Sequence, residues 1–376
     1  MDTWTVWIVL IIEVIAAGGL MLLIPSITRR GLLFGVYVGE AQSTSDRART
    51  ITRGWYAIMI GALLASILLG VGLGISHPQS PAGALLPLCL LLGGTLVSYL
   101  RAHVQSRALA TTGAPVSAAA FVIDSPQSLT IPILATAFAL VGAALAVAYA
   151  SWNFAAMPES VPTHFGASGQ PDAWSPRSFS SVMLLPILTM VLCPMLGLMA
   201  CLTARAKRAI RQADQGVSFD AQIRFRRAMT LFLSGTVILI TVMLTTMSID
   251  SVRVSLGLAE GLSLLGTGTG VLLVVYALGG TVYLMLHFGQ GGARLERSAA
   301  GAPLTNGLAD NSHWVLGMFY VNRDDPSFFV EKRFGMGYTI NLGNPRALVF
   351  FVAFLVIIGA IIGISSSMPQ SHGAIR

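Results

Sequence analysis

Residues 347–364 read ALVFFVAFLVIIGAIIGI and contain no charged side chain. As an α-helix this stretch is about 27 Å long, which is close to the hydrocarbon thickness of a bilayer. Seven similar runs precede it: Trp4–Ile24, Trp55–Ile75, Gly83–Leu100, Ile131–Ser151, Val182–Leu202, Met229–Ser248 and Leu262–His287. We therefore predict an all-α integral membrane protein with about eight transmembrane helices.

Composition supports this class. Of the 376 residues 54% are hydrophobic and only 10% charged, whereas about 25% of residues are charged in a soluble domain. The mean hydropathy is +0.74. The net charge of +7 does not indicate nucleic-acid binding, because the basic residues lie in short loops between the apolar runs. The cysteines Cys89, Cys193 and Cys201 fall inside apolar runs, so neither a disulfide framework nor a metal site is expected from them.

The loops alternate in charge along the chain. Basic residues concentrate in residues 26–54, 101–107, 204–227 and 294–346, whereas residues 76–82, 152–181 and 249–261 hold at most one each. The positive-inside rule then places both termini outside and the basic loops in the cytoplasm. The N-terminus has no basic region before its apolar run, so we expect an uncleaved first span.

These patterns divide the chain into three parts. Residues 1–288 form the helix bundle with an outer loop at 152–181, residues 289–346 a cytoplasmic linker with a small β element, and residues 347–376 the last helix and a short outer tail. In the middle part, Trp314–Val321, Ser327–Phe334 and Tyr338–Leu342 are β-prone runs separated by turn residues. They predict a hairpin or a three-stranded meander on the inner membrane face.

Several helix starts are expected from capping residues. Ser125-Pro126 and Ser175-Pro176 each have the pattern of an N-cap followed by proline. Ser218 with Asp220 is typical of the start of a cytoplasmic helix. Asp250 and Glu260 lie at the predicted outer edge, where we expect them to face solvent.

The outer loop gathers polar residues in an otherwise apolar protein. Pro158 and Pro162 favour an extended backbone, and the later glycines permit tight turns. His164, Asp172 and Glu159 can then converge. Three roles remain open: they brace the loop by hydrogen bonds, they contact a ligand or partner, or His164 and Asp172 hold a metal ion or transfer protons.

The same loop resembles the signature loop of SdpI-like bacterial membrane proteins. The resemblance is carried by Pro158, Pro162, His164, Gly169, Pro171, Asp172 and Trp174. Many members have Asn where this chain has Gly166. The family includes immunity proteins against a secreted peptide toxin, which are shorter than this chain. Residues 33–38 and 314–345 resemble a longer branch, which has a second small domain near its C-terminus.

Glu13 lies about ten residues into the first span. An acidic side chain near mid-bilayer costs at least about 2–3 kcal/mol. We therefore expect Glu13 to face the bundle, to be protonated or to pair with a partner. It is either a proton or cation site or a hydrogen-bonded residue between helices.

Three functions follow, and the first is favoured. The resemblance implies a non-enzymatic protein of the bacterial cytoplasmic membrane that binds a secreted peptide or envelope ligand, for tolerance or signalling. His164, Asp172, Trp174 and Glu159 would then contact the ligand. The alternatives are an ion-coupled transporter that uses Glu13 and a metal-dependent membrane enzyme that uses His164, Asp172 and Glu159. The chain has no hydrolase or nucleotide-binding motif, so we expect no cofactor. The expected partners are membrane lipids and that ligand, without nucleic acid, and the sequence does not give the oligomeric state.

Overall fold

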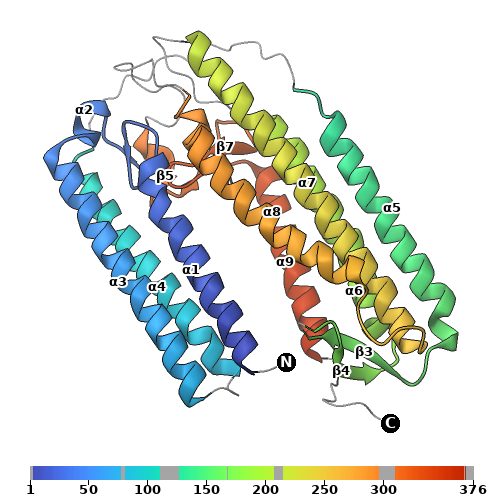
Figure 1. Cartoon of the computed structure of the whole chain (residues 1–376). Coiled ribbons are helices and arrows are strands. Elements are labelled where there is room, and N and C mark those ends of the chain that lie inside the picture. The colour runs from blue at the N-terminus through green and yellow to red at the C-terminus, as the bar shows by residue number, and fades with distance from the viewer. Residues whose placement is uncertain are drawn as a thin grey trace. The chain divides into compact units, whose positions relative to one another are not determined.

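The computed structural model in Figure 1 describes residues 3–77, 81–110, 127–166, 168–206, 215–295, 310–367 and 369. This part of the chain contains eight helices that are long and apolar enough to cross a membrane, and each covers one of the predicted runs. The multi-span membrane fold is thus confirmed, while the orientation stays a prediction. The helices are α1 (Thr3–Ile27), α3 (Asp46–Ser76), α4 (Pro81–Arg107), α5 (Thr130–Asn153), α6 (Phe179–Ala204), α7 (Gln215–Ser255), α8 (Leu264–Phe288) and α9 (Pro345–Ser367).

The described residues group into two compact units made of alternating segments. Unit 1 contains residues 1–125, 206–226 and 281–348, and unit 2 contains residues 126–205, 227–280 and 349–376. Helices α7, α8 and α9 each contribute to both. These units are defined by compactness and not by membrane topology. They therefore do not test the predicted division of the chain into three parts at residues 288 and 346, which stays a prediction.

In unit 1, α1, α3 and α4 pack side by side. The chain leaves α1 through a hairpin of β1 (Leu32–Leu33) and β2 (Val36–Tyr37), followed by the short helix α2 (Glu40–Ser43). The turn residue Phe34 is almost fully buried and packs against Trp55 of α3, with ring centroids 5.7 Å apart. Its carbonyl oxygen accepts a hydrogen bond from Nδ1 of His103 at 2.9 Å. The hairpin therefore closes one end of the three-helix core.

In place of the predicted single hairpin or three-stranded meander, this segment forms two short hairpins. β5 (Trp314–Val315) pairs with β6 (Phe319–Tyr320), and β7 (Phe329–Glu331) pairs with β8 (Tyr338–Ile340). The first β-prone run folds back on itself through the three residues Leu316, Gly317 and Met318. Leu316 and Gly317 both adopt positive φ angles, and the Met318 N–H donates to the Val315 carbonyl oxygen at 3.2 Å.

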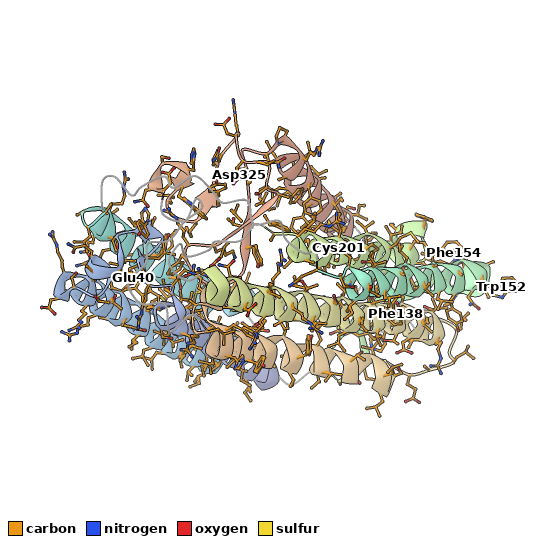
Figure 2. The ribbon with its side chains drawn as sticks, turned by 90° about the horizontal axis from the view of Figure 1, so that it is seen from above. Glu40, Phe138, Trp152, Phe154, Cys201 and Asp325 are labelled. Carbon is orange, nitrogen blue, oxygen red and sulfur yellow. The ribbon has the colours of Figure 1, made fainter. Side chains whose placement is uncertain are left out.

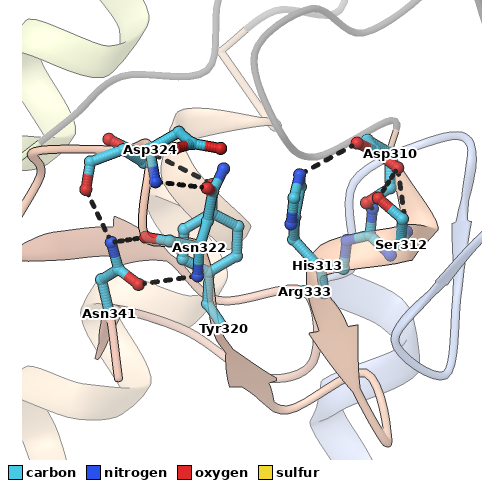
Figure 3. A network of polar contacts seen from close by, with 9 residues as sticks. Asp310, Ser312, His313, Tyr320, Asn322, Asp324, Arg333 and Asn341 are labelled. Carbon is cyan, nitrogen blue, oxygen red and sulfur yellow. Dashed lines mark hydrogen bonds and ion pairs between the residues drawn. The ribbon is translucent and has the colours of Figure 1, made fainter. Parts of the chain in front are cut away.

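A polar network joins the two hairpins (Figure 3). The Tyr320 hydroxyl donates to Asp325 at 3.0 Å. The Asn341 amide donates to the carbonyl oxygens of Asn322 and Asp325, both at 2.9 Å. On the other side, Arg333 donates to the Asn311 side chain at 2.6 Å and lies over the Trp314 ring. These contacts give order to strands that are too short to be stable alone.

A buried ion pair ties this β element to the end of α1. The guanidinium of Arg29 lies 3.3 Å from the Glu331 carboxylate, and both side chains are almost fully buried. Arg29 also donates to the Gly291 carbonyl oxygen at 2.9 Å, and its backbone N–H donates to Gln290 at 2.9 Å. Gln290 in turn donates to the Lys332 carbonyl oxygen. The pair and its neighbours thus connect three segments that are far apart in sequence.

In unit 2, α5 packs against α6 through a face of small residues. The buried residues of α5 are Pro132, Ala135, Ala139, Gly142, Ala143, Ala146 and Ala150. A side chain at Gly197 of α6 would collide with Thr136, so the helices approach as closely as small residues allow. Large side chains of α5 such as Phe138 and Trp152 are exposed instead (Figure 2).

The capping predictions are partly wrong. Helix α6 begins at Phe179, where Ser178 and Ser181 form a capping box, and Ser175 lies in a strand. Helix α7 begins at Gln215, before Ser218. Ser125 and Pro126 lie outside the described residues. The glycines early in the seventh run do not interrupt α8.

The Arg29–Glu331 pair predicts a large loss of stability when one charge is removed. In Glu331→Gln the Arg29 charge stays buried without its partner, which costs about 3–5 kcal/mol. The exposed pair of Arg49 with Asp46, 3.4 Å apart, is the matched control, and Asp46→Asn should leave stability nearly unchanged. Thermal unfolding of the purified variants in detergent measures both. Equal unfolding midpoints for the two variants would contradict the prediction.

Candidate functional site

The outer-loop segment folds into a β-hairpin in unit 2. β3 (Ser160–Phe165) pairs antiparallel with β4 (Pro171–Pro176). Sequence analysis predicted an extended segment and tight turns but no strand pairing. The strand pairing is hard to recognise in the sequence, because prolines cannot donate to a ladder and argue against an interior strand. The hairpin accommodates them because it is an isolated pair of strands with two open edges.

Arg177 fastens the base of the hairpin to the end of α5. Its guanidinium donates to the carbonyl oxygens of Phe154 at 3.3 Å, Ala155 at 3.2 Å and Met157. These carbonyls lie in and just after the 3-10 turn Phe154–Ala156 that follows α5, where the end of a helix leaves carbonyl oxygens without an i+4 partner. The Arg177 backbone N–H also donates to the Glu159 carbonyl oxygen at 2.6 Å. In the sequence, Arg177 stands out only as the single basic residue of residues 152–181.

The tip of the hairpin rests on the loop between α7 and α8. Gly169 has a φ of 78°, and its carbonyl oxygen accepts a hydrogen bond from the Leu262 N–H at 2.8 Å. That loop is held by Asp250, which accepts hydrogen bonds from the Ser263 N–H at 2.8 Å and the Ser263 hydroxyl at 2.6 Å. Asp250 is therefore buried, and the expectation that it faces solvent was wrong.

His164 and Asp172 meet on the hairpin. Nδ1 of His164 lies 2.5 Å from Oδ1 of Asp172. Two register irregularities flank His164, between Pro162 and His164 and between His164 and Phe165, and such bulges redirect side chains. An ionised carboxylate only accepts, so Nδ1 carries the proton and Nε2 of a neutral ring is left as an acceptor.

The pair is accessible, because the His164 and Asp172 side chains are 66% and 52% exposed. Glu159 does not join it. Glu159 precedes β3 and lies five residues before His164, about 16 Å along an extended strand. Trp174 lies opposite Pro162 in the ladder and is half-buried. Within the described part of the chain, no group of three or more His, Cys, Asp or Glu residues is arranged to hold a metal ion.

A cavity of about 240 Å³ lies beneath the hairpin, within unit 2. One wall is apolar and includes Val161, Phe165, Leu185 and Val252. His164 and Thr163 reach it from the hairpin. The cavity therefore joins the exposed polar pair to an apolar interior.

Hydroxyl groups of α7 line the other wall of this cavity. Ser248 and Ser255 donate to carbonyl oxygens of α7 at 2.7 and 2.8 Å, and Ser251 donates to the Pro162 carbonyl oxygen at 3.1 Å. Their protons are thus already used, and lone pairs remain to accept from a ligand. These serines were not among the predicted site residues, although their spacing of three and four residues places them on one face of a helix.

Glu13 is not part of this site. It lies on α1 in unit 1, and its side chain is exposed. Ile12 and Ile15 beside it are 57% and 49% exposed. The expectation that it packs against other helices finds no support within unit 1, and its role stays a prediction.

The backbone conformation of Gly169 at the hairpin tip predicts the effect of substituting this glycine. In Gly169→Ala the new side chain requires a strained positive φ and meets Thr267 at 3.4 Å, which should destabilise the protein by about 1–2 kcal/mol. Gly268→Ala, with open space around its Cβ, is the control and should not be destabilising. Thermal unfolding in detergent compares them. A Gly169→Ala protein as stable as the control would show that residue 169 is not held at this positive φ.

Two family models match parts of the chain. A domain of unknown function (DUF1648) matches residues 139–190, which contain the hairpin and its flanking helix segments. A family of unknown function (DUF5808) matches residues 323–348, which contain β7, β8 and the start of α9. Comparison with curated proteins and with solved structures found no match. The chain is thus a multi-span membrane protein that carries two domains of unknown function.

Proposed function

We propose that this chain is an SdpI-like protein of the bacterial cytoplasmic membrane that binds a peptide at the β3–β4 hairpin. Binding confers tolerance to that peptide or passes a signal inward. The observation that carries the proposal is the cavity beneath the His164–Asp172 pair. An exposed polar rim above an apolar interior is the usual form of a site that orients a ligand by a few polar groups.

The chemistry of the cavity favours a peptide over other ligands. The Ser251 hydroxyl and Nε2 of a neutral His164 ring present acceptors in the cavity, and the Asp172 carboxylate, bonded to His164, presents acceptors beside it. A peptide backbone or amino terminus supplies N–H donors, and apolar side chains fill the wall formed by Phe165 and Leu185. Among the described residues that line the cavity, none is Lys or Arg, so an anionic ligand would lack a counter-charge.

The alternatives have less support. A metal-dependent enzyme would use His164 and Asp172 with Glu159, but the hairpin register separates Glu159 from the pair. An ion-coupled transporter would use Glu13, which does not line the cavity at the end of α1 in unit 1. Peptide binding therefore accounts best for the residues that the hairpin brings together.

The proposal predicts a loss of tolerance when the polar pair is removed. A sensitive bacterium expressing the chain is challenged with a panel of secreted membrane-active peptides, and the inhibitory concentration of each is measured. For a peptide to which the wild type gives tolerance, His164→Ala and Asp172→Asn should lower that concentration by about tenfold, the effect of one charged hydrogen bond.

His77→Ala is the matched control, because His77 is an exposed histidine at the end of α3 in unit 1. It should retain full tolerance. Membrane levels and thermal unfolding of each variant exclude a folding defect. Full tolerance in a normally folded His164→Ala protein would refute the role of the pair.

A further inference from the structure

A second cavity lies in unit 1, at the end of α1. Its volume is about 160 Å³. Four segments surround it: the end of α1 with the residues that follow it, the β1–β2 hairpin, the connection from α2 into the first turns of α3, and Phe334 between β7 and β8. The spanning part of α1 ends here at Ile27, and that of α3 begins here at Asp46. The cavity therefore lies where a membrane surface meets the protein.

The floor of this cavity is apolar and its rim is polar. Leu32, Leu33 and Phe34 form the floor, and each is at most 8% exposed. The rim carries hydroxyl side chains and arginine, namely Thr28, Arg30, Ser43, Thr44 and Thr52. None of the described residues that line the cavity is acidic.

The two arginines at this cavity differ in their surroundings. Arg29 is buried, and its charge is compensated by Glu331. Arg30 is exposed, and in the described part of the chain no hydrogen bond or ion pair engages its guanidinium. The charge of Arg30 is therefore available to a ligand. A guanidinium binds a phosphate group in bidentate fashion.

We propose that this cavity binds the phosphate of an anionic phospholipid headgroup. Arg30 pairs with the phosphate, and the apolar floor contacts the glycerol and the first carbons of the acyl chains. Basic pockets beside spanning helices recognise lipid headgroups in this way. A free phosphate ion offers the same charge but nothing that the floor of Leu32 and Leu33 can contact, so the lipid is the source that fits the whole cavity.

Native mass spectrometry of the purified full-length protein tests the proposal. The protein is incubated with mixed micelles of phosphatidylglycerol and phosphatidylcholine, and the ratio of retained lipids is measured. The wild type should prefer phosphatidylglycerol, and Arg30→Gln should lower that preference by about fivefold. Arg47→Gln is the control, because Arg47 is an exposed arginine in the first turn of α3 that does not line the cavity. It should retain the preference.

Two outcomes would overturn the proposal. Equal losses in Arg30→Gln and Arg47→Gln would show that net charge, and not the cavity, selects the lipid. Inorganic phosphate added at the same concentration is the second arm. If phosphate alone displaces phosphatidylglycerol from the wild type but not from Arg30→Gln, the site takes soluble phosphate compounds and the lipid assignment is wrong. Because Arg30 lies in unit 1, either result leaves the peptide site in unit 2 untouched.

Discussion

The buried pair of Arg29 and Glu331 is the constraint on which unit 1 depends. Neither charge is tolerable without the other once water is excluded, so the end of α1 and strand β7 must come together for the unit to form. Gln290 and Gly291 complete the arrangement by bonding to Arg29. Gly291 adopts a φ of 55°, and a side chain there would collide with Glu331. The positions of these residues, their charges and the backbone conformation of Gly291 are thus all consistent with a single geometry. The same geometry shapes the cavity beside Arg30.

The spans were predictable because hydrocarbon acts on each helix separately. A run such as residues 347–364 specifies its environment without reference to any other segment. The β elements were harder because their order comes from distant contacts. Trp314–Val321 was correctly recognised as β-prone, but a pattern of apolar residues does not show that Leu316 and Gly317 turn the chain back so early. The turn is favoured because the Leu316 carbonyl oxygen accepts a hydrogen bond from Tyr99 at 2.7 Å, and Tyr99 is more than two hundred residues away in the chain.

The candidate site was predictable in its residues but not in its form. His164 and Asp172 were expected to converge because both are polar residues in one short loop. Their contact depends on two irregularities in the strand register, which sequence spacing does not show. Glu159 was included for the same reason and lies at the other end of the hairpin. Arg177 and Ser251 were missed because their roles are contacts with backbone carbonyls of other segments, and such contacts leave no pattern in the sequence.

The separation of Arg29 from its partners along the chain has a consequence for biosynthesis. Gln290 follows Arg29 by 261 residues, and Glu331 comes later still. At a translation rate of about 5–20 residues per second, roughly 15–60 s pass between the synthesis of the arginine and that of the carboxylate. During this interval α1 is already in the membrane while its arginine has nothing to pair with but water and lipid headgroups. One end of unit 1 therefore stays open in the nascent protein until the segment that carries Glu331 has been made.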